Sequence, residues 1–204
     1  MKKGLISYSP AHVGAFLKSS PEIDLPDLQF VFTPASYTEG MIGKLQNIPG
    51  ITCGVWQSRP QSRGYVRALS SHIKDAPLIQ PNYLKETIDQ DVLIQGVKIC
   101  RDLLKTSKMK KISIKETLPG ENIKTDSEIL NFIKNNGATV YHAIGSCRMG
   151  IDKDAVVDAN LKLNGVENLR VADASIMPTM PSGNTNAATL MIAEKASDLI
   201  KKDM

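Results

Sequence analysis

The strand-like segments of this 204-residue chain come in groups, before and after two helices, instead of alternating with helices one by one. Short apolar or β-branched stretches cover 13–17, 28–32, 51–57 and 64–69, and proline or glycine residues separate them. Regular alternation of strands and helices would predict a parallel sheet. Its absence predicts an α+β fold, in which helices cover one face of an antiparallel sheet.

Two helices stand out between the groups of strands. Residues 89–105 carry apolar side chains at a spacing that places them on one face of a helix. The second helix begins with Thr125 to Glu128, a capping box in which the two end residues bond each other's backbone. It ends at Asn136-Gly137, where we expect a glycine in the left-handed conformation.

The composition excludes several classes of protein. Hydrophobic residues make up 42% and charged residues 23%, as in a globular protein, and no stretch approaches the roughly 20 apolar residues that span a bilayer. The formal net charge is +4 without a dense basic run, so we expect no nucleic-acid partner. The three cysteines lack paired spacing, which predicts neither a disulfide framework nor a metal site, and we expect a cytoplasmic protein.

The residues with the clearest chemical potential begin at position 141. His142 is followed by Gly145 and Gly150, which allow a close backbone approach or a positive φ. Imidazole titrates near neutral pH, so a histidine in such a loop is a candidate acid or base. A structural histidine held by hydrogen bonds is the alternative, and the local residues alone leave both open.

The segments that follow His142 predict further strands and a final helix. Apolar residues between 156 and 171, with a turn at Asn164-Gly165, predict short strands that end at Asp173. An apolar run from Asn186 to about Ile200 predicts a capped helix. The amino-terminal N–H groups of this helix would present partial positive charge to a bound group.

One set of residues recurs in a fixed order along this carboxy-terminal stretch: Tyr141-His142, Gly145, Cys147 to Gly150, Val156 to Asp158, Leu169 to Val171, Asp173 to Ser175, Pro178, Gly183 to Asn186, Glu194-Lys195 and Leu199-Ile200. In these residues the stretch resembles the signature of the glucose-methanol-choline (GMC) flavoprotein oxidoreductases, and most closely their choline dehydrogenase-type alcohol dehydrogenases. Weaker similarity extends upstream through Ser62 to Gly64 and Asn82 to Leu84, so that most of the chain is covered.

The resemblance implies two parts of the chain. Residues 1–140 would form a substrate-binding α+β domain, and residues 141–204 a signature segment that completes the FAD site and packs on an FAD domain. That domain carries a GxGxxG loop in this family, and the chain has no such spacing of glycines. We therefore expect an amino-terminal FAD domain as a partner, and a fragment that is inactive without it.

The implied reaction is the oxidation of a small-molecule alcohol, with hydride transfer from its CH-OH group to N5 of FAD. His142 occupies the position of the family's active-site histidine and would accept the hydroxyl proton. Asn184 would hold the substrate oxygen by a hydrogen bond. Because an amide takes up no proton at neutral pH, His142 must be the base.

The resemblance also implies contacts with the cofactor. Asp173 and Ala174 match the stretch that runs beside the ribityl and diphosphate groups of FAD. Asn184, Thr185 and Asn186 match the helix start that points its N–H groups at the isoalloxazine ring. No metal ligand is implied.

Two other functions stay open. The chain could be a non-catalytic binding or regulatory remnant of the same fold, or a structural domain with an accidental motif. The alcohol does not follow from the sequence, and neither does the electron acceptor. Dehydrogenases that pass electrons to a quinone or another carrier resemble this stretch somewhat more than oxygen-reducing oxidases do.

Overall fold

The computed structural model describes residues 9, 11–38 and 44–203. They form two compact units. The first contains the described residues up to Ser62 together with Leu84–Ala138, and the second contains Arg63–Tyr83 and residues 139–203. Residues 63–83 therefore belong to the second compact unit. The division into a substrate-binding domain of 1–140 and a signature segment of 141–204 stays a prediction.

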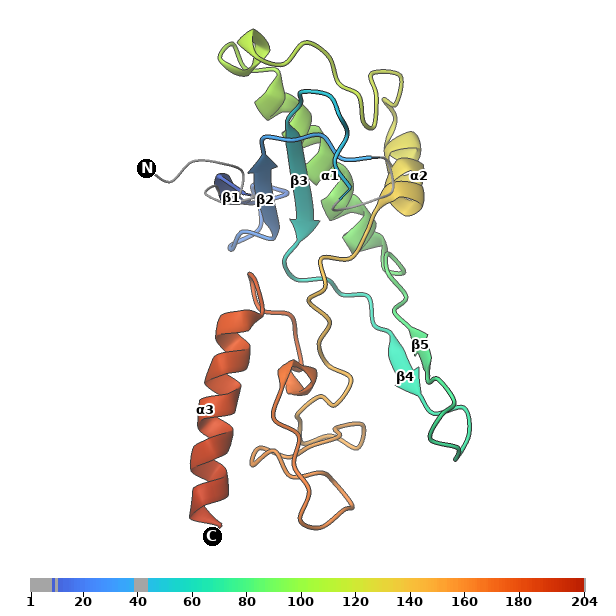
Figure 1. The fold of residues 1–204 in the computed structure, drawn as a ribbon, viewed down its shortest axis with the longest axis vertical. Helices are drawn as coiled ribbons and strands as arrows, with labels where there is room; N and C mark the ends of the chain where they lie inside the picture. Colours follow the sequence, from blue (N-terminus) through green and yellow to red (C-terminus); the bar gives the residue numbers. More distant parts are fainter. Residues whose placement is uncertain (1–8, 10, 39–43, 204) are drawn as a thin grey trace. The chain divides into compact units, whose positions relative to one another are not determined.

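The first unit is built on a three-stranded antiparallel sheet. Its strands lie in the order β1 (Val13–Leu17), β2 (Leu28–Thr33) and β3 (Thr52–Gln57). Helix α1 (Thr87–Leu104) packs on β2 and β3, behind the sheet in Figure 1, and α2 (Asp126–Asn136) packs on α1. The predicted α+β class with an antiparallel sheet is confirmed.

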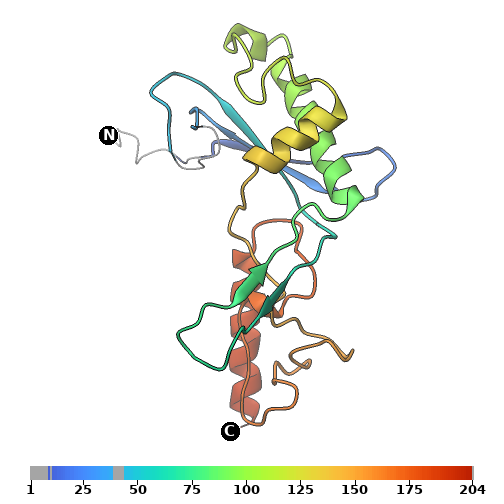
Figure 2. The same ribbon diagram turned by 90° about the vertical axis from the view of Figure 1, so that its right-hand side faces the viewer.

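The core of the first unit lies between α1 and the sheet. Leu28 and Phe30 of β2 are fully buried, and Val92 and Cys100 of α1 pack against them. Gly96 allows the helix to approach the sheet closely, because a Cβ atom at this position would lie 2.8 Å from a methyl group of Val55. Figure 2 shows α1 and α2 from the side.

A buried carboxylate anchors the chain before α1. Asp89, 2% exposed, accepts hydrogen bonds from the Gln57 side chain at 3.0 Å, from the Gln61 N–H at 2.8 Å and from the Ser62 N–H at 2.7 Å. The Ser62 hydroxyl also donates to it. Burial raises the pKa of Asp89, but these hydrogen bonds outweigh burial and hold the pKa below its ordinary value.

Helix α2 begins as predicted and ends differently. The Glu128 N–H donates to the Thr125 hydroxyl at 3.2 Å and the Glu128 carboxylate accepts from the Thr125 N–H at 2.8 Å, so the capping box is confirmed. The expected left-handed glycine is wrong, because Gly137 has φ −67° and ψ 149°. Glycine is required there for space, since a Cβ atom would lie 2.5 Å from the Ile133 carbonyl oxygen.

The second unit contains one hairpin and one long helix. Strands β4 (Tyr65–Arg67) and β5 (Leu78–Gln80) pair antiparallel, and β5 was not predicted. Helix α3 (Asn186–Lys202) follows, and its bounds are close to the predicted range of Asn186 to about Ile200. Short 3₁₀ helices occur in both units, at η2 (Met109–Lys111) in the first and at η3 (Ala174–Ile176) in the second.

The strands predicted between residues 156 and 173 do not form. This region contains only isolated bridges, such as Val157 with Leu163 and Lys162 with Arg170. Leu161 and Asn168 adopt positive φ, and the predicted turn at Asn164-Gly165 is present with Gly165 at φ +79°. Reversals at such short intervals leave extended pieces too short for a ladder of hydrogen bonds.

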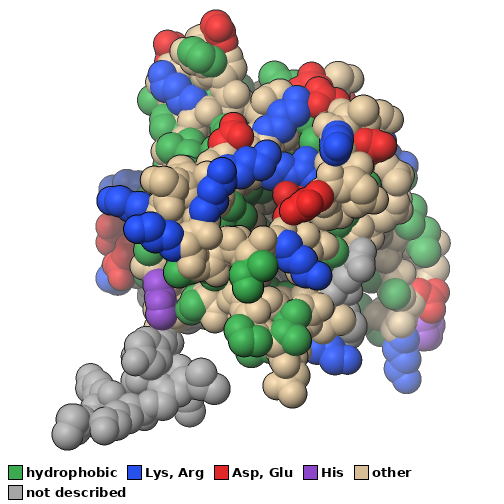
Figure 3. All heavy atoms as spheres, turned by 90° about the horizontal axis from the view of Figure 1, so that it is seen from above, with side chains coloured by type: hydrophobic (Ala, Val, Ile, Leu, Met, Phe, Trp, Pro, Cys, Tyr) green, Lys and Arg blue, Asp and Glu red, His purple; other side chains and the backbone are tan. Residues whose placement is uncertain are grey.

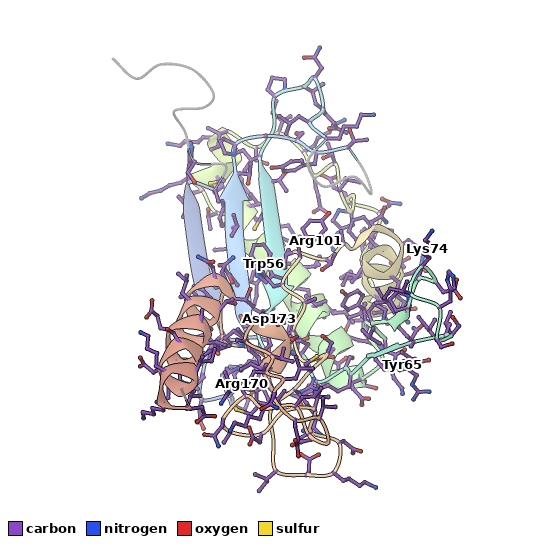
Figure 4. The ribbon with its side chains drawn as sticks, turned by 60° about the horizontal axis from the view of Figure 1, so that its bottom comes forward. Trp56, Tyr65, Lys74, Arg101, Arg170 and Asp173 are labelled. Atoms are coloured by element: carbon purple, nitrogen blue, oxygen red, sulfur yellow. The ribbon has the colours of Figure 1, made fainter. Side chains whose placement is uncertain are left out.

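Apolar side chains from these loops pack on α3. Val157, Leu161, Ile176, Ile192 and Ala196 are buried together in the core of the second unit. The far end of α3 is held by ion pairs that Asp203 makes with Lys162 at 2.7 Å and with Arg170, which is labelled in Figure 4.

None of the helices in the described residues has both the length and the apolar character to cross a bilayer. Figure 3 shows Asp and Glu side chains among the Lys and Arg side chains of one face. That face therefore mixes both signs of charge.

Candidate active site

The loop that carries His142 is shaped by unusual backbone conformations. Tyr141 has φ +61°, which is rare for a residue with a side chain, and Gly145 has φ +82°, as the sequence suggested. The chain then runs beside η3, where the Cys147 N–H donates to the Ser175 carbonyl at 3.0 Å. The Met149 N–H donates to the Ile176 carbonyl at 2.8 Å. These bonds place the His142 loop against the segment that leads to α3.

His142 lies between the side chains of two consecutive residues that precede α3. The Asn184 amide nitrogen, Nδ2, lies 2.9 Å from Nε2 of His142, and the Thr185 hydroxyl lies 3.0 Å from Nδ1. His142 is half-buried and Asn184 is exposed. The two residues that the sequence singled out as a catalytic pair are therefore in direct contact.

These contacts indicate which ring nitrogen of His142 carries hydrogen. An amide nitrogen can only donate, so Nε2 accepts from Asn184. The hydrogen of the neutral ring then lies on Nδ1, which donates to the Thr185 hydroxyl oxygen. A neutral imidazole in this form has its lone pair at Nε2, on the side of Asn184.

Thr185 connects the histidine to the start of α3. It is the N-cap residue of the helix, 9% exposed, and its side chain makes no capping hydrogen bond. The first-turn N–H groups of α3 thus have no partner from this cap side chain, and Asn186 at the helix start is exposed. The amino end of α3 presents donors and partial positive charge to a bound acceptor.

Asp173 and Ala174 lie at the start of η3, where Figure 4 labels Asp173. The Asp173 carboxylate accepts from the Ser175 N–H at 2.7 Å, and hydrogen bonds from Ser175 lower the pKa of Asp173. Asp173 is exposed, whereas Ala174 is half-buried against the core of the second unit. Both residues precede the chain that runs to Asn184, but none of their contacts joins them to His142.

An apolar cavity of about 290 Å³ lies beside α3. Its walls include Met149, Ile176, Pro178 and Met191, and neither His142 nor Asn184 lines it. Among the residues that the structure describes, no cluster of three or more His, Cys, Asp or Glu side chains could hold a metal ion. The groups in contact at the His142 site are an imidazole, an amide and a hydroxyl.

Sequence reasoning missed two features of this site. The contact of the Thr185 hydroxyl with Nδ1 of His142 was not predicted, and the expected contact of Thr185 with the cofactor stays a prediction. The left-handed conformation of Tyr141 was not expected, because no glycine or asparagine marks it. Only the position of Thr185 next to Asn184 could have indicated its role.

Comparison with known proteins shows the family to which this chain belongs. A family model described as GMC oxidoreductase matches residues 60–193. An alcohol dehydrogenase [acceptor] of Pseudomonas putida is 42% identical over 205 residues, which cover 100% of this chain and 37% of that protein. The mitochondrial choline dehydrogenase of Homo sapiens is 40% identical over 191 residues, which cover 92% of this chain and 32% of the relative.

Solved structures agree with the sequence relatives. The pyridoxine 4-oxidase from Mesorbium loti superposes with a TM-score of 0.84 at 29% identity, covering 95% of this chain and 38% of that chain. A formate oxidase of Aspergillus oryzae superposes with a TM-score of 0.77 at 26% identity, covering 88% and 32%. The chain spans about a third of the length of the curated relatives it matches. It belongs to the GMC oxidoreductase family.

Proposed function

We propose that this chain contributes the proton-accepting part of the active site of an FAD-dependent alcohol dehydrogenase. The observation that carries the proposal is the contact of 2.9 Å between His142 Nε2 and Asn184 Nδ2. It brings a base and a hydrogen-bond donor to one point, which is what removal of a proton from an alcohol oxygen requires.

His142 acts as the base in this proposal. Its Nε2 lone pair accepts the hydroxyl proton of the substrate, while Nδ1 keeps its hydrogen on the Thr185 oxygen at 3.0 Å. For this transfer the Asn184 N–H group first turns from Nε2 to the substrate oxygen, which frees the lone pair, and it then stabilises the negative charge that develops on that oxygen. Because Asn184 is exposed, a substrate oxygen can reach both groups.

The residues at the start of α3 fit an FAD ring. The helix start lacks a side-chain cap, so its N–H groups suit an electron-rich acceptor such as the pyrimidine edge of a flavin. Asn184, Thr185 and Asn186 would hold the ring from this side, and Asp173 and Ala174 would lie along the ribityl and diphosphate part. Bound FAD would supply the acceptor for the hydride.

The substrate and the partner follow from the same proposal. The names alcohol dehydrogenase and choline dehydrogenase of two relatives support a small alcohol that is oxidised at a CH-OH group. The FAD-binding domain would be a further part of the enzyme, outside these residues. The free thiols of Cys53, Cys100 and Cys147 suit a reducing compartment, so we propose a cytoplasmic location.

A hybrid enzyme tests the proposed function. In the Pseudomonas putida alcohol dehydrogenase, this chain would replace the 37% of the protein that it matches. We expect a yellow protein that reduces an artificial dye acceptor when a primary alcohol or choline is added, and we expect His142→Gln to abolish dye reduction while the yellow colour remains.

Two results would contradict the proposal. The first is a hybrid that binds FAD normally and reduces no dye with any alcohol of a broad panel. Such a result would favour the non-catalytic remnant. The second is unchanged dye reduction in the His142→Gln hybrid, which would remove the imidazole from the reaction.

A further inference from the structure

Two thiols meet across the interface between the sheet and α1. The sulfur atoms of Cys53 on β3 and Cys100 on α1 lie 3.0 Å apart, closer than ordinary van der Waals contact between two sulfurs. Both cysteines are free. The Cys100 sulfur also lies 3.9 Å from the carbonyl oxygen of Cys53. Both residues belong to the first compact unit.

The surroundings hold this pair in place and leave one side accessible. Cys100 is 8% exposed and belongs to the core cluster with Leu28, Phe30 and Val92. Cys53 is half-buried, and β3 forms an edge of the three-stranded sheet. Cys53 is therefore the more accessible of the two cysteines to a small reagent.

The two thiols differ in acidity, which suits a stepwise reaction. The hydrogen bond from Cys100 lowers the pKa of the Cys53 thiol, although burial opposes this change. The same hydrogen bond and burial raise the pKa of the Cys100 thiol. The partly exposed sulfur is thus the better nucleophile, because the thiolate is the form that attacks.

We infer that Cys53 and Cys100 form a modification site at which a hydroperoxide converts the two thiols into a disulfide. The Cys53 thiolate attacks the peroxide oxygen, the O–O bond breaks, and Cys53 becomes a sulfenic acid as an alcohol or water leaves. The Cys100 sulfur then attacks the Cys53 sulfur and releases water. Overall, two thiols lose two electrons and two protons, and the hydroperoxide is reduced.

The disulfide would join β3 covalently to α1. Positions 53 and 100 are 47 residues apart, so the bond would close a long loop and limit the freedom of the unfolded chain. The sulfurs already touch in the folded protein, so little rearrangement is needed. This reaction is independent of the His142 site, and it goes beyond the proposed oxidation of alcohols.

Thiol counting by mass spectrometry tests the inference on the full chain without flavin. The reduced protein is treated with increasing hydrogen peroxide, the peroxide is destroyed with catalase, and the remaining thiols are labelled with N-ethylmaleimide. We expect a loss of two labels out of the three cysteines, a mass lower by two hydrogen atoms before labelling, and a cross-linked Cys53–Cys100 peptide. Dithiothreitol should restore all labels.

Three variants separate this pair from general oxidation. Cys147→Ser should form the same disulfide, whereas Cys53→Ser and Cys100→Ser should form no intramolecular disulfide. The urea concentration at which half of the wild-type protein is unfolded should rise on oxidation and return on reduction. For Cys53→Ser and Cys100→Ser, this concentration should not change on oxidation. Three labelled thiols after peroxide treatment, a cross-link that includes Cys147, or Cys53 oxidised to a sulfinic acid without a cross-link would each overturn the inference.

Discussion

The hydroxyl oxygen of Thr185 lies 3.0 Å from Nδ1 of His142. Since Thr185 is 9% exposed and its side chain makes no capping bond to α3, this hydroxyl is available to the imidazole. The Asn184 amide, which can only donate, makes Nε2 of His142 the acceptor, and the Thr185 hydroxyl supports this tautomer by accepting the hydrogen on Nδ1. Thr185 is thus a positioning residue for the proposed base.

Replacement of Thr185 by valine should weaken the preference of His142 for the tautomer with its hydrogen on Nδ1. Valine keeps the shape of threonine and removes the oxygen that accepts from Nδ1. In the full chain, long-range ¹H–¹⁵N correlation spectra of the imidazole should change from one tautomer to a mixture. In the hybrid enzyme, kcat should fall by about fivefold, the equivalent of one hydrogen bond of ~1 kcal/mol.

Thr185→Ser is the matched control because serine keeps the hydroxyl. It should restore the wild-type ring spectrum and most of the turnover. An unchanged tautomer in Thr185→Val would show that the hydroxyl does not position the ring, whatever the activity of the hybrid.

Substitution of the proposed base should stop the chemistry and leave the cofactor in place. In the hybrid enzyme, His142→Gln should lower kcat by about 10² to 10⁴, the range for a general base. Asn184→Ala should have a smaller effect, since it removes a hydrogen-bond donor and leaves the base. Stopped-flow spectra of flavin reduction would measure both.

His72→Gln is the control for the histidine substitution. His72 is exposed in the second unit and lies 3.7 Å from Asp75, so its loss should leave flavin reduction unchanged. An equal loss of rate in His72→Gln and His142→Gln would mean that the effect is not specific to the site.

Asp89→Asn should destabilise the first unit. Each carboxylate oxygen of Asp89 accepts two hydrogen bonds, from Gln57 and Gln61 at one oxygen and from Ser62 at the other. The amide nitrogen of asparagine would face two donors at whichever position it takes. The free energy of unfolding should fall by about 2 to 3 kcal/mol at neutral pH, measured by urea denaturation.

The effect of Asp89 should also depend on pH. The folded protein holds the pKa of Asp89 below its ordinary value, so the carboxylate stabilises the fold fully above pH ~4, and this contribution is lost as the pH falls through the lowered pKa. The difference between wild type and Asp89→Asn should therefore shrink in acid. Asp91→Asn, on the exposed side of α1, should change little at any pH; a similar loss there would contradict the role of the buried network.

Truncation of Ile192 should weaken the second unit. Ile192 is 7% exposed and packs on Val157 and Ile176, so Ile192→Ala should lower the free energy of unfolding by about 2 to 4 kcal/mol. Leu190→Ala changes an exposed residue of the same helix, 60% exposed, and should have an effect below ~0.5 kcal/mol. Thermal denaturation of the full chain compares the two, and equal losses would mean that α3 does not pack as described.

Local sequence patterns predicted the helices well, but they predicted the strands after residue 70 badly. Thr125 and Glu128 are three residues apart, so the hydrogen bonds that begin α2 are encoded in four consecutive residues. The strands predicted between 156 and 173 and the missed strand β5 depend on pairing with other segments. Apolar spacing indicates that a segment is extended, but it does not identify a partner strand.

The family resemblance, and not residue spacing, suggested that His142 and Asn184 act together. The structure brings them into contact across 42 positions of the chain. The resemblance did not indicate that Thr185 holds the imidazole or that Cys53 touches Cys100. These contacts depend on how particular side chains pack in this chain.

The sequence by itself determined the α+β class, the capping box that begins α2 and the turn at Asn164-Gly165, because each of these depends on hydrogen bonds or apolar faces within a few neighbouring residues. Only the tertiary structure decided the partner of each functional side chain. His142 and Thr185 are 43 positions apart, and Cys53 and Cys100 are 47 apart. Contacts of this range depend on tertiary packing, since the packing of α1 on the sheet and of α3 on its loops brings those side chains together.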